Sequence, residues 1–169
     1  MDINYKNANY LQLDLAENQF DLVIMIYTDF CVLHPEKRMQ LLNNVRKWLK
    51  PGGIFIFDAN SDKELEKKVI KKNWEVAEKG FWKDKPYLIL SESYLYPKEK
   101  VILFQHIVSD VDDKTEVYRF YTHFFSGKDL IRELGKSGFS KVTVHNDVLP
   151  GEDMWNGEHI FFCIAVNSK

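Results

Sequence analysis

The sequence predicts an α/β fold organised around one stretch, residues 20–58. Two apolar runs, Phe20–Tyr27 and Ile54–Asp58, are rich in Ile, Val and Phe, and a segment with helical spacing separates them, as in a βαβ unit. Neither run alternates with polar residues, so we expect parallel strands whose two faces are both covered by helices. Because ligands bind beyond the carboxyl ends of the strands in such sheets, residues 27–30 and 58–60 form the candidate site.

Length and composition are those of a single globular domain. The chain has 169 residues, of which 45% are hydrophobic and 28% charged. A formal net charge of −2 gives no reason to expect nucleic acid as a partner. No apolar run reaches the ~18 residues that would span a membrane, and the N-terminus lacks the apolar segment of a signal peptide. Two cysteines far apart in the chain, Cys31 and Cys163, predict reduced thiols in a soluble, cytoplasmic protein.

The segments around the first apolar run have patterns of their own. Tyr10–Leu15 alternates weakly and predicts a short strand that ends in a carboxylate, Asp14, which could instead cap the following turn. A helix is expected to begin near Pro35, because proline suits the first helical position. Its apolar residues, spaced three and four apart, form one face toward the sheet: Leu41, Leu42, Val45, Trp48 and Leu49. The Pro-Gly-Gly at residues 51–53 ends this helix and turns the chain into the second strand.

The rest of the chain changes from helical to β-rich patterns and back. We expect a lysine-rich helix over Ser61–Trp74, and then an antiparallel meander, residues 84–125, inserted into the α/β scheme. The meander consists of three β-rich runs joined by short polar turns: Tyr87–Tyr96, Val101–Asp110 and Glu116–Phe125. Ser126 then caps a helix over Lys128–Lys136, with Asp129 in the position of a capping box. Two last strands follow, over Ser140–Asn146 and Ile160–Val166.

The stretch at residues 20–58 also carries a family resemblance. An Asp-Leu-Val-Ile strand, a helix, Leu-Lys-Pro-Gly-Gly and a strand ending in Asp58 resemble strands 4 and 5 of the class I S-adenosylmethionine-dependent methyltransferases of the small-molecule type. With Tyr10–Leu15 as strand 3, the resemblance reaches to strand 7 at the C-terminus. It implies a truncated Rossmann-like methyltransferase sheet of strands 3 to 7, with an inserted three-stranded antiparallel β cap covering the site. It also implies S-adenosylmethionine as the cofactor.

The resemblance assigns roles to five residues of this chain. As the acid that ends strand 3, Asp14 would bind the adenine amino group of the cofactor, and Leu15 would lie against the adenine ring. Tyr27, Thr28 and Phe30 stand at the end of strand 4, where the family's cofactor contacts cluster. All five are therefore expected to bind the cofactor.

Methyl transfer requires few catalytic groups from the protein. Transfer from a sulfonium is an in-line displacement, so the protein positions and desolvates the reacting groups, and no metal or protein nucleophile is required. Asp29 could orient or deprotonate a small-molecule acceptor, or cap the following helix. Asp58 and Asn60 could touch the acceptor or cap a loop. His106 and His123 would suit a general base if they line the pocket, although aromatic side chains on strands more often form core.

The family's glycine-rich loop and first two strands have no counterpart here, since the first of the eight glycines is Gly52. The chain thus resembles the C-terminal part of a methyltransferase, and a shortened gene model would explain the same pattern. In the family's strand order, 3-2-1-4-5-7-6, strand 4 would remain as an apolar edge, which natural proteins avoid. We therefore expect a homodimer, a segment exchange or an N-terminal partner chain to cover it. Two functions follow: methylation of a small-molecule acceptor, or a non-catalytic methyltransferase-like subunit that needs a partner.

Overall fold

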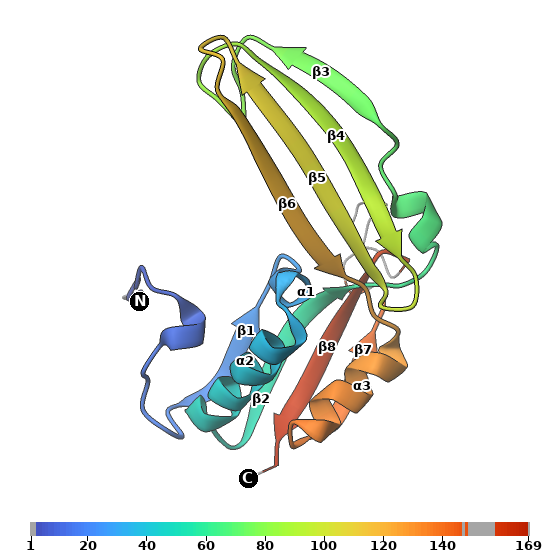
Figure 1. The fold of residues 1–169 in the computed structure, drawn as a ribbon. Helices are drawn as coiled ribbons and strands as arrows, with labels where there is room; N and C mark the ends of the chain where they lie inside the picture. Colours follow the sequence, from blue (N-terminus) through green and yellow to red (C-terminus); the bar gives the residue numbers. More distant parts are fainter. Residues whose placement is uncertain (1–2, 147, 149–157, 169) are drawn as a thin grey trace. The chain divides into compact units, whose positions relative to one another are not determined.

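The computed structural model describes residues 3–146, 148 and 158–168. The chain divides into two compact units: Met1–Ser61 with Phe125–Lys169, here called the first unit, and Asp62–Phe124, here called the second unit. The first unit is an α/β layer and the second is an antiparallel sheet (Figure 1). Among the described residues, no helix is long and apolar enough to cross a membrane.

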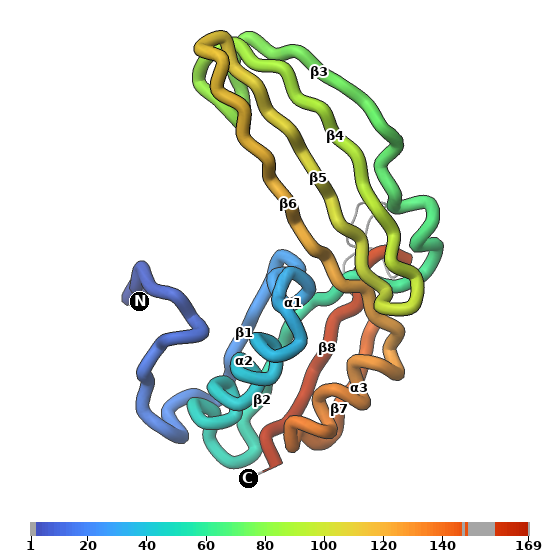
Figure 2. The backbone as a smooth tube through the Cα atoms, in the orientation of Figure 1, coloured from blue at the N-terminus to red at the C-terminus, as the bar shows by residue number. Residues whose placement is uncertain are grey.

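The first unit contains a four-stranded sheet in the order β1-β2-β8-β7. Strands β1 and β2 are parallel, whereas β8 is antiparallel to both of its neighbours, and the backbone trace shows β2 lying between β1 and β8 (Figure 2). This order confirms the expected 4-5-7-6 part of the sheet. The strands are β1 (Phe20–Met25), β2 (Leu49–Asn60), β7 (Phe139–His145) and β8 (Ile160–Asn167).

Within the described part of the first unit, three helices pack on one face of this sheet, and their beginnings follow local sequence signals. Helix α1 (Asp29–Val32) follows β1, and α2 (Pro35–Trp48) begins at the predicted proline and buries four of the five predicted apolar residues. The fifth, Leu49, already lies in β2, so the helix ends before the Pro-Gly-Gly that was expected to end it. Helix α3 (Gly127–Lys136) has the predicted capping box: the Ser126 hydroxyl accepts the Asp129 N–H at 3.2 Å, and the Asp129 carboxylate accepts the Ser126 N–H at 3.1 Å. These helices enclose the core of the first unit together with β2 and β8.

The opposite face of the same sheet is not covered by the described residues. Leu22 and Ile24 on β1 are 44% and 57% exposed, and Ile54 on β2 is also exposed. The expectation that both faces are covered is therefore wrong for the described part of the chain. Both faces of β1 are nevertheless apolar. Leu22 and Ile24 point to the uncovered face, and the residues that alternate with them, Val23 and Met25, pack against the core on the side of the helices.

The predicted strand at Tyr10–Leu15 is not formed. Residues Tyr10–Gln12 form a single turn of 3₁₀ helix, η1, after Asn9, whose side chain accepts the Leu11 N–H at 3.0 Å. The backbone groups of a strand need hydrogen-bond partners on a neighbouring strand, and here side chains of α2 bind the backbone of this segment instead. The Gln40 and Asn44 amides donate to the Leu11 carbonyl at 3.0 and 3.1 Å. The weak alternation of this segment therefore does not settle its conformation.

The second unit is a four-stranded antiparallel sheet in the order β3-β4-β5-β6. Three strands are those expected of the meander, and a fourth, β3, pairs with the edge of β4. The predicted helix over Ser61–Trp74 is wrong. It is replaced by a short 3₁₀ helix, η2, in which only Leu65 is buried, and by β3, where Trp74 and Val76 favour a strand. The elements are η2 (Leu65–Lys68), β3 (Asn73–Ala77), β4 (Tyr87–Tyr96), β5 (Val101–Asp110) and β6 (Thr115–His123).

Candidate functional site

The chain turns sharply at the carboxyl end of β1, where the site is expected. Tyr27 and Thr28 both have left-handed backbone conformations, with φ of 73° and 55°. Such conformations cost non-glycine residues about 1–3 kcal/mol each. Helix α1 begins directly after this turn, because the Thr28 carbonyl accepts the Cys31 N–H at 2.8 Å. Strain of this kind clusters at functional sites, which makes the turn a candidate.

The carboxylate of Asp58, at the carboxyl end of β2, holds this turn. One oxygen accepts the Tyr27 N–H at 3.0 Å and the other accepts the Thr28 N–H at 2.9 Å. Bonds to a charged acceptor contribute roughly 1.5–3 kcal/mol each, enough to offset the strain of the turn. The residue is only 1% exposed, and this burial raises the pKa of Asp58, an effect that the two N–H groups oppose. Of the two roles considered from the sequence, the structure gives Asp58 that of a loop cap.

Helix α1 is fixed to the end of β2 by two further contacts. The Phe30 ring is fully buried, with its centroid 4.5 Å from that of Phe57 and 5.7 Å from that of Phe125. The Cys31 sulfur accepts the Asn60 N–H at 3.1 Å. The predicted cofactor residue Phe30 therefore points into the core of the first unit rather than into an open site.

Tyr10 reaches the same turn and was not expected there. Its hydroxyl donates a hydrogen bond to Asp29, and burial together with this carboxylate raises the pKa of Tyr10 to about 12. Both side chains line a cavity of about 160 Å³ between β1 and α2, with Val23 and Met25 among its apolar walls. Apart from an aromatic residue in a segment predicted to be a strand, no signal in the sequence marks this contact. The predicted catalytic Asp29 thus lies beside a small cavity, paired with a phenol.

The other two predicted cofactor residues of the first unit lie in the segment between η1 and β1. The Asp14 side chain is 98% exposed, with the Lys47 ammonium 4.0 Å from its carboxylate. Leu15 is partly buried against the core. The Tyr27 side chain is 74% exposed at the turn. Asp14 and Tyr27 are therefore accessible to a ligand, and their cofactor contacts remain predictions.

In the second unit, His106 belongs to an aromatic cluster on one face of the sheet. The Trp82 ring lies 5.0 Å from the His106 ring and 4.9 Å from the Tyr118 ring, and Phe120 lies 6.0 Å from His106. The Nδ1 atom of His106 is 2.9 Å from the Ser91 hydroxyl. Burial lowers the pKa of His106, so the imidazole is neutral at pH 7. A neutral imidazole within an aromatic wall is suited to accept a proton from an acceptor.

His123 lies on the other face of the same sheet. In the β5–β6 register, His106 pairs with Tyr118 and Val101 pairs with His123, without a bulge between them. Side chains alternate along a strand, so Tyr118 and Phe120 share the face of His106, whereas His123 points away from it. The two histidines named as candidate bases therefore cannot line one pocket on this sheet.

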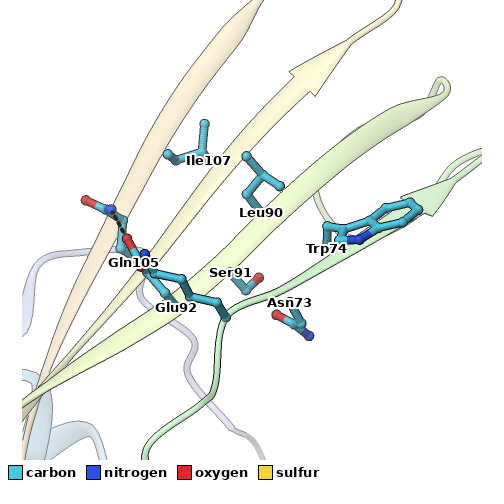
Figure 3. A pocket seen from close by; sticks show the side chains of 8 residues that line it. Asn73, Trp74, Leu90, Ser91, Glu92, Gln105 and Ile107 are labelled. Atoms are coloured by element: carbon cyan, nitrogen blue, oxygen red, sulfur yellow. Dashed lines mark hydrogen bonds and ion pairs between the residues drawn. The ribbon is translucent and has the colours of Figure 1, made fainter.

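A groove of about 290 Å³ is lined by residues of β3, β4 and β5 (Figure 3). The β4–β5 register places two of them, Leu90 and Ile107, on the face opposite His106. Leu90 and Ile107 form its apolar floor, and Trp74 stands at its edge on β3. The Glu92 carboxylate accepts hydrogen bonds from the Tyr94 hydroxyl and, at 3.1 Å, from the Gln105 amide, and it pairs with the Lys72 ammonium at 3.2 Å. These partners, the Tyr94 hydroxyl first, lower the pKa of Glu92. The Glu92 carboxylate of the groove is thus held by three neighbouring polar side chains.

Comparison with known proteins shows what this chain is similar to. The family model described as a methyltransferase domain matches residues 1–53. No curated protein has significant sequence similarity to the chain. Among solved structures, a S-adenosylmethionine-dependent methyltransferase from Clostridium acetobutylicum is 15% identical with a TM-score of 0.61, covering 96% of this chain and 63% of its own. The sugar N-methyltransferase KedS8 from Streptoalloteichus is 15% identical with a TM-score of 0.61, covering 96% and 61%.

A third structure agrees with these two. The methyltransferase CcbJ from Streptomyces caelestis is 17% identical with a TM-score of 0.59, and the match covers 94% of this chain and 61% of CcbJ. The chain thus spans 61–63% of the length of these three structures. The comparisons include both units, since they cover nearly all of the chain. The chain has the fold of the class I S-adenosylmethionine-dependent methyltransferases.

Proposed function

We propose that this chain belongs to an S-adenosylmethionine-dependent methyltransferase that acts on a small-molecule acceptor, and that its first unit binds the cofactor at the carboxyl end of β1. The observation that carries this proposal is the strained turn at Tyr27 and Thr28, which Asp58 holds at that edge of the sheet. The match of the methyltransferase domain to residues 1–53 includes this turn. Two of the similar structures are described as methyltransferases of an amino pentose and of a sugar nitrogen.

The cofactor supplies an activated methyl group, so the residues of the first unit have binding and positioning roles. Asp14 accepts hydrogen bonds from the adenine amino group, and Leu15 packs against the ring. Tyr27 and Thr28 contact the cofactor through the exposed side of their turn, and Phe30 supports that turn from the core. These roles agree with the exposure of Asp14 and Tyr27 in the structure.

The acceptor's proton is the remaining chemical problem, because an amine or hydroxyl must lose a proton when it is methylated. His106 is the better of the two candidate histidines, since its lowered pKa keeps it neutral and an aromatic cluster surrounds it. Asp29 could orient the acceptor, although its hydrogen bond from Tyr10 also stabilises the turn. His106→Gln is expected to lower kcat more than it changes cofactor affinity. An unchanged kcat would place His106 in the core only.

The second candidate function is a subunit that completes its cofactor site with a partner. Within the described residues β1 pairs with β2 alone, so its other edge is unpaired, and Leu22 and Ile24 are exposed on the uncovered face of the sheet beside that edge. An apolar edge strand is a template for pairing with another chain. We propose that a second copy of this chain covers it, giving a homodimer, with a separate N-terminal partner chain as the alternative.

Light scattering tests this proposal about the β1 edge. At micromolar concentration the wild-type chain should have the mass of a dimer, and the Ile24→Lys variant should have the mass of a monomer. Ile131→Lys is the matched control, because Ile131 is similarly exposed but lies on α3. A wild-type monomer, or a dimer that survives Ile24→Lys, would contradict a homodimer through this edge. A monomer that captures an N-terminal chain would favour the alternative.

Calorimetric titration with S-adenosylhomocysteine tests the proposed function. We expect micromolar binding by the wild-type chain, and roughly tenfold weaker binding by Asp14→Asn if one adenine hydrogen bond is lost. Glu17→Gln is the matched control, because Glu17 is another exposed acid in the same segment and has no assigned role. Absence of binding by the wild-type chain would refute a cofactor site in this chain.

A further inference from the structure

The turn after β1 is held by a contact that crosses two strands. Tyr27 and Thr28 are followed by a helix of only four residues, and neither is a glycine although both have positive φ. Their two N–H groups point at one carboxylate, that of Asp58, which is 1% exposed. A turn that merely joined β1 to α1 would reach this conformation at lower cost with glycine. The chain instead keeps a tyrosine and a threonine here, and a buried carboxylate to hold them.

The rest of α1 does not depend on this carboxylate. Phe30 packs on Phe57 in the core, and the Cys31 sulfur binds the Asn60 N–H. Loss of the Asp58 contacts should therefore release the turn without displacing the helix. The turn positions the exposed Tyr27 side chain and, two residues later, the Asp29 carboxylate beside the cavity that Tyr10 lines.

We propose that Asp58 is a positioning residue, whose carboxylate holds the Tyr27–Thr28 turn in its left-handed form and so sets Tyr27 and Asp29 for the ligand at the carboxyl end of β1. This inference rests on the proposed function as far as the ligand is concerned. The conformational part stands on the geometry alone, since it requires only that the two N–H bonds maintain the turn.

Asp58→Asn tests both parts, because it keeps the size of the side chain but loses its charge and one acceptor. Amide hydrogen exchange by NMR should become at least tenfold faster at Tyr27 and Thr28 and remain unchanged at Asn60. S-adenosylhomocysteine affinity, measured by calorimetry, should fall about tenfold. Asp21→Asn is the matched control, since Asp21 lies at the other end of β1 in an exposed pair with Lys50. It should change neither measurement.

Thr28→Gly provides the rescue, because glycine adopts a positive φ without strain. In the Asp58→Asn background it should slow amide exchange at Tyr27 again, back toward the wild-type rate. If Asp58→Asn does not fold, Thr28→Gly alone still decides, since relief of strain should raise the thermal stability of the wild-type chain. A lower stability would overturn the claim of strain.

The outcomes separate the two proposals. Unchanged exchange at Tyr27 and Thr28 in Asp58→Asn would overturn the holding role of Asp58. Faster exchange with unchanged ligand affinity would overturn its positioning role and make the contact purely structural. If the wild-type chain does not bind S-adenosylhomocysteine, the proposed function fails and the positioning role with it, while the exchange rates still decide whether Asp58 holds the turn.

Discussion

Arg38 gives the sharpest prediction about stability, because it is a buried charge with identified partners. The residue is 5% exposed on α2, and its Nε atom donates to the Glu133 carboxylate of α3 at 2.8 Å. A second nitrogen, Nη1, donates to the Leu33 carbonyl at 2.6 Å. The guanidinium also lies over the Phe30 and Phe125 rings, at 5.7 and 5.1 Å from their centroids. One side chain thus joins both long helices of the first unit.

Arg38→Met retains most of the side-chain volume and removes the charge. Breaking a buried ion pair from one side costs about 3–5 kcal/mol, since the other charge stays buried without its partner. The Glu133 side chain is 21% exposed, so water reaches it and the cost should lie near the lower end, about 3 kcal/mol. With a urea m-value of about 2 kcal/mol/M, the midpoint of unfolding should fall by about 1.5 M.

Urea unfolding of three variants checks this reasoning. Arg38→Met/Glu133→Leu should recover to within about 1 kcal/mol of wild type, because no unpaired charge is left. Arg132→Met is the matched control: Arg132 pairs with Asp129 at the surface of α3 and is expected to contribute less than about 1 kcal/mol. A cost below about 1 kcal/mol for Arg38→Met, or a double variant no more stable than the single one, would refute the argument.

Three further predictions follow from groups whose pKa is shifted by their surroundings. Burial raises the pKa of the Cys31 and Cys163 thiols to about 12, so Ellman's reagent at pH 8 should leave both unmodified in the folded chain and react with both in denaturant. Asp29→Asn should lower the pKa of Tyr10 from about 12 but leave it above 10, because burial is the larger cause; phenolate absorbance, compared with Tyr10→Phe, measures it. Burial lowers the pKa of His106 below 6.5, so between the folded and the unfolded pKa the unfolded chain binds more protons than the folded chain. The free energy of unfolding should therefore decline as the pH falls from 6.5 toward the folded pKa, and an NMR titration of the imidazole checks the direction of the shift.

The parts of the fold that could be predicted from the sequence are those with local or repeated signals. The runs of β1 and β2 are apolar throughout, Pro35 marks the start of α2, and Ser126 with Asp129 forms a capping box within four residues. Each of these signals depends on neighbours in the chain and needs no knowledge of the tertiary structure.

The errors concern residues whose conformation depends on distant partners. Tyr10–Leu15 alternates like a strand, but the amides of α2 bind its backbone in place of a neighbouring strand. Ser61–Trp74 has a lysine-rich helical pattern with few apolar residues to bury, and its end joins the sheet instead as β3. A pattern of low apolar content leaves the choice between helix and strand to tertiary contacts.

The geometry of the candidate site could be predicted only in part. The carboxyl ends of β1 and β2 do meet at the strained turn, as expected for a parallel sheet. That Asp58 binds the N–H groups of residues about thirty positions earlier is invisible in the sequence, because no local pattern marks such a contact. The placement of His106 and His123 on opposite faces depends on the β5–β6 register, which the sequence left open.

Hydrogen-exchange mass spectrometry with S-adenosylhomocysteine tests the proposed cofactor site most directly. A saturating concentration of the ligand should slow amide exchange in two segments, residues 13–15 and 26–29. The exchange rates of the residues that line the groove beside Trp74 should not change. This pattern would locate the cofactor at the carboxyl end of β1, next to the turn that Asp58 holds. Exchange that is unaffected in both segments, or protection confined to the second unit, would contradict a cofactor site at this edge of the sheet.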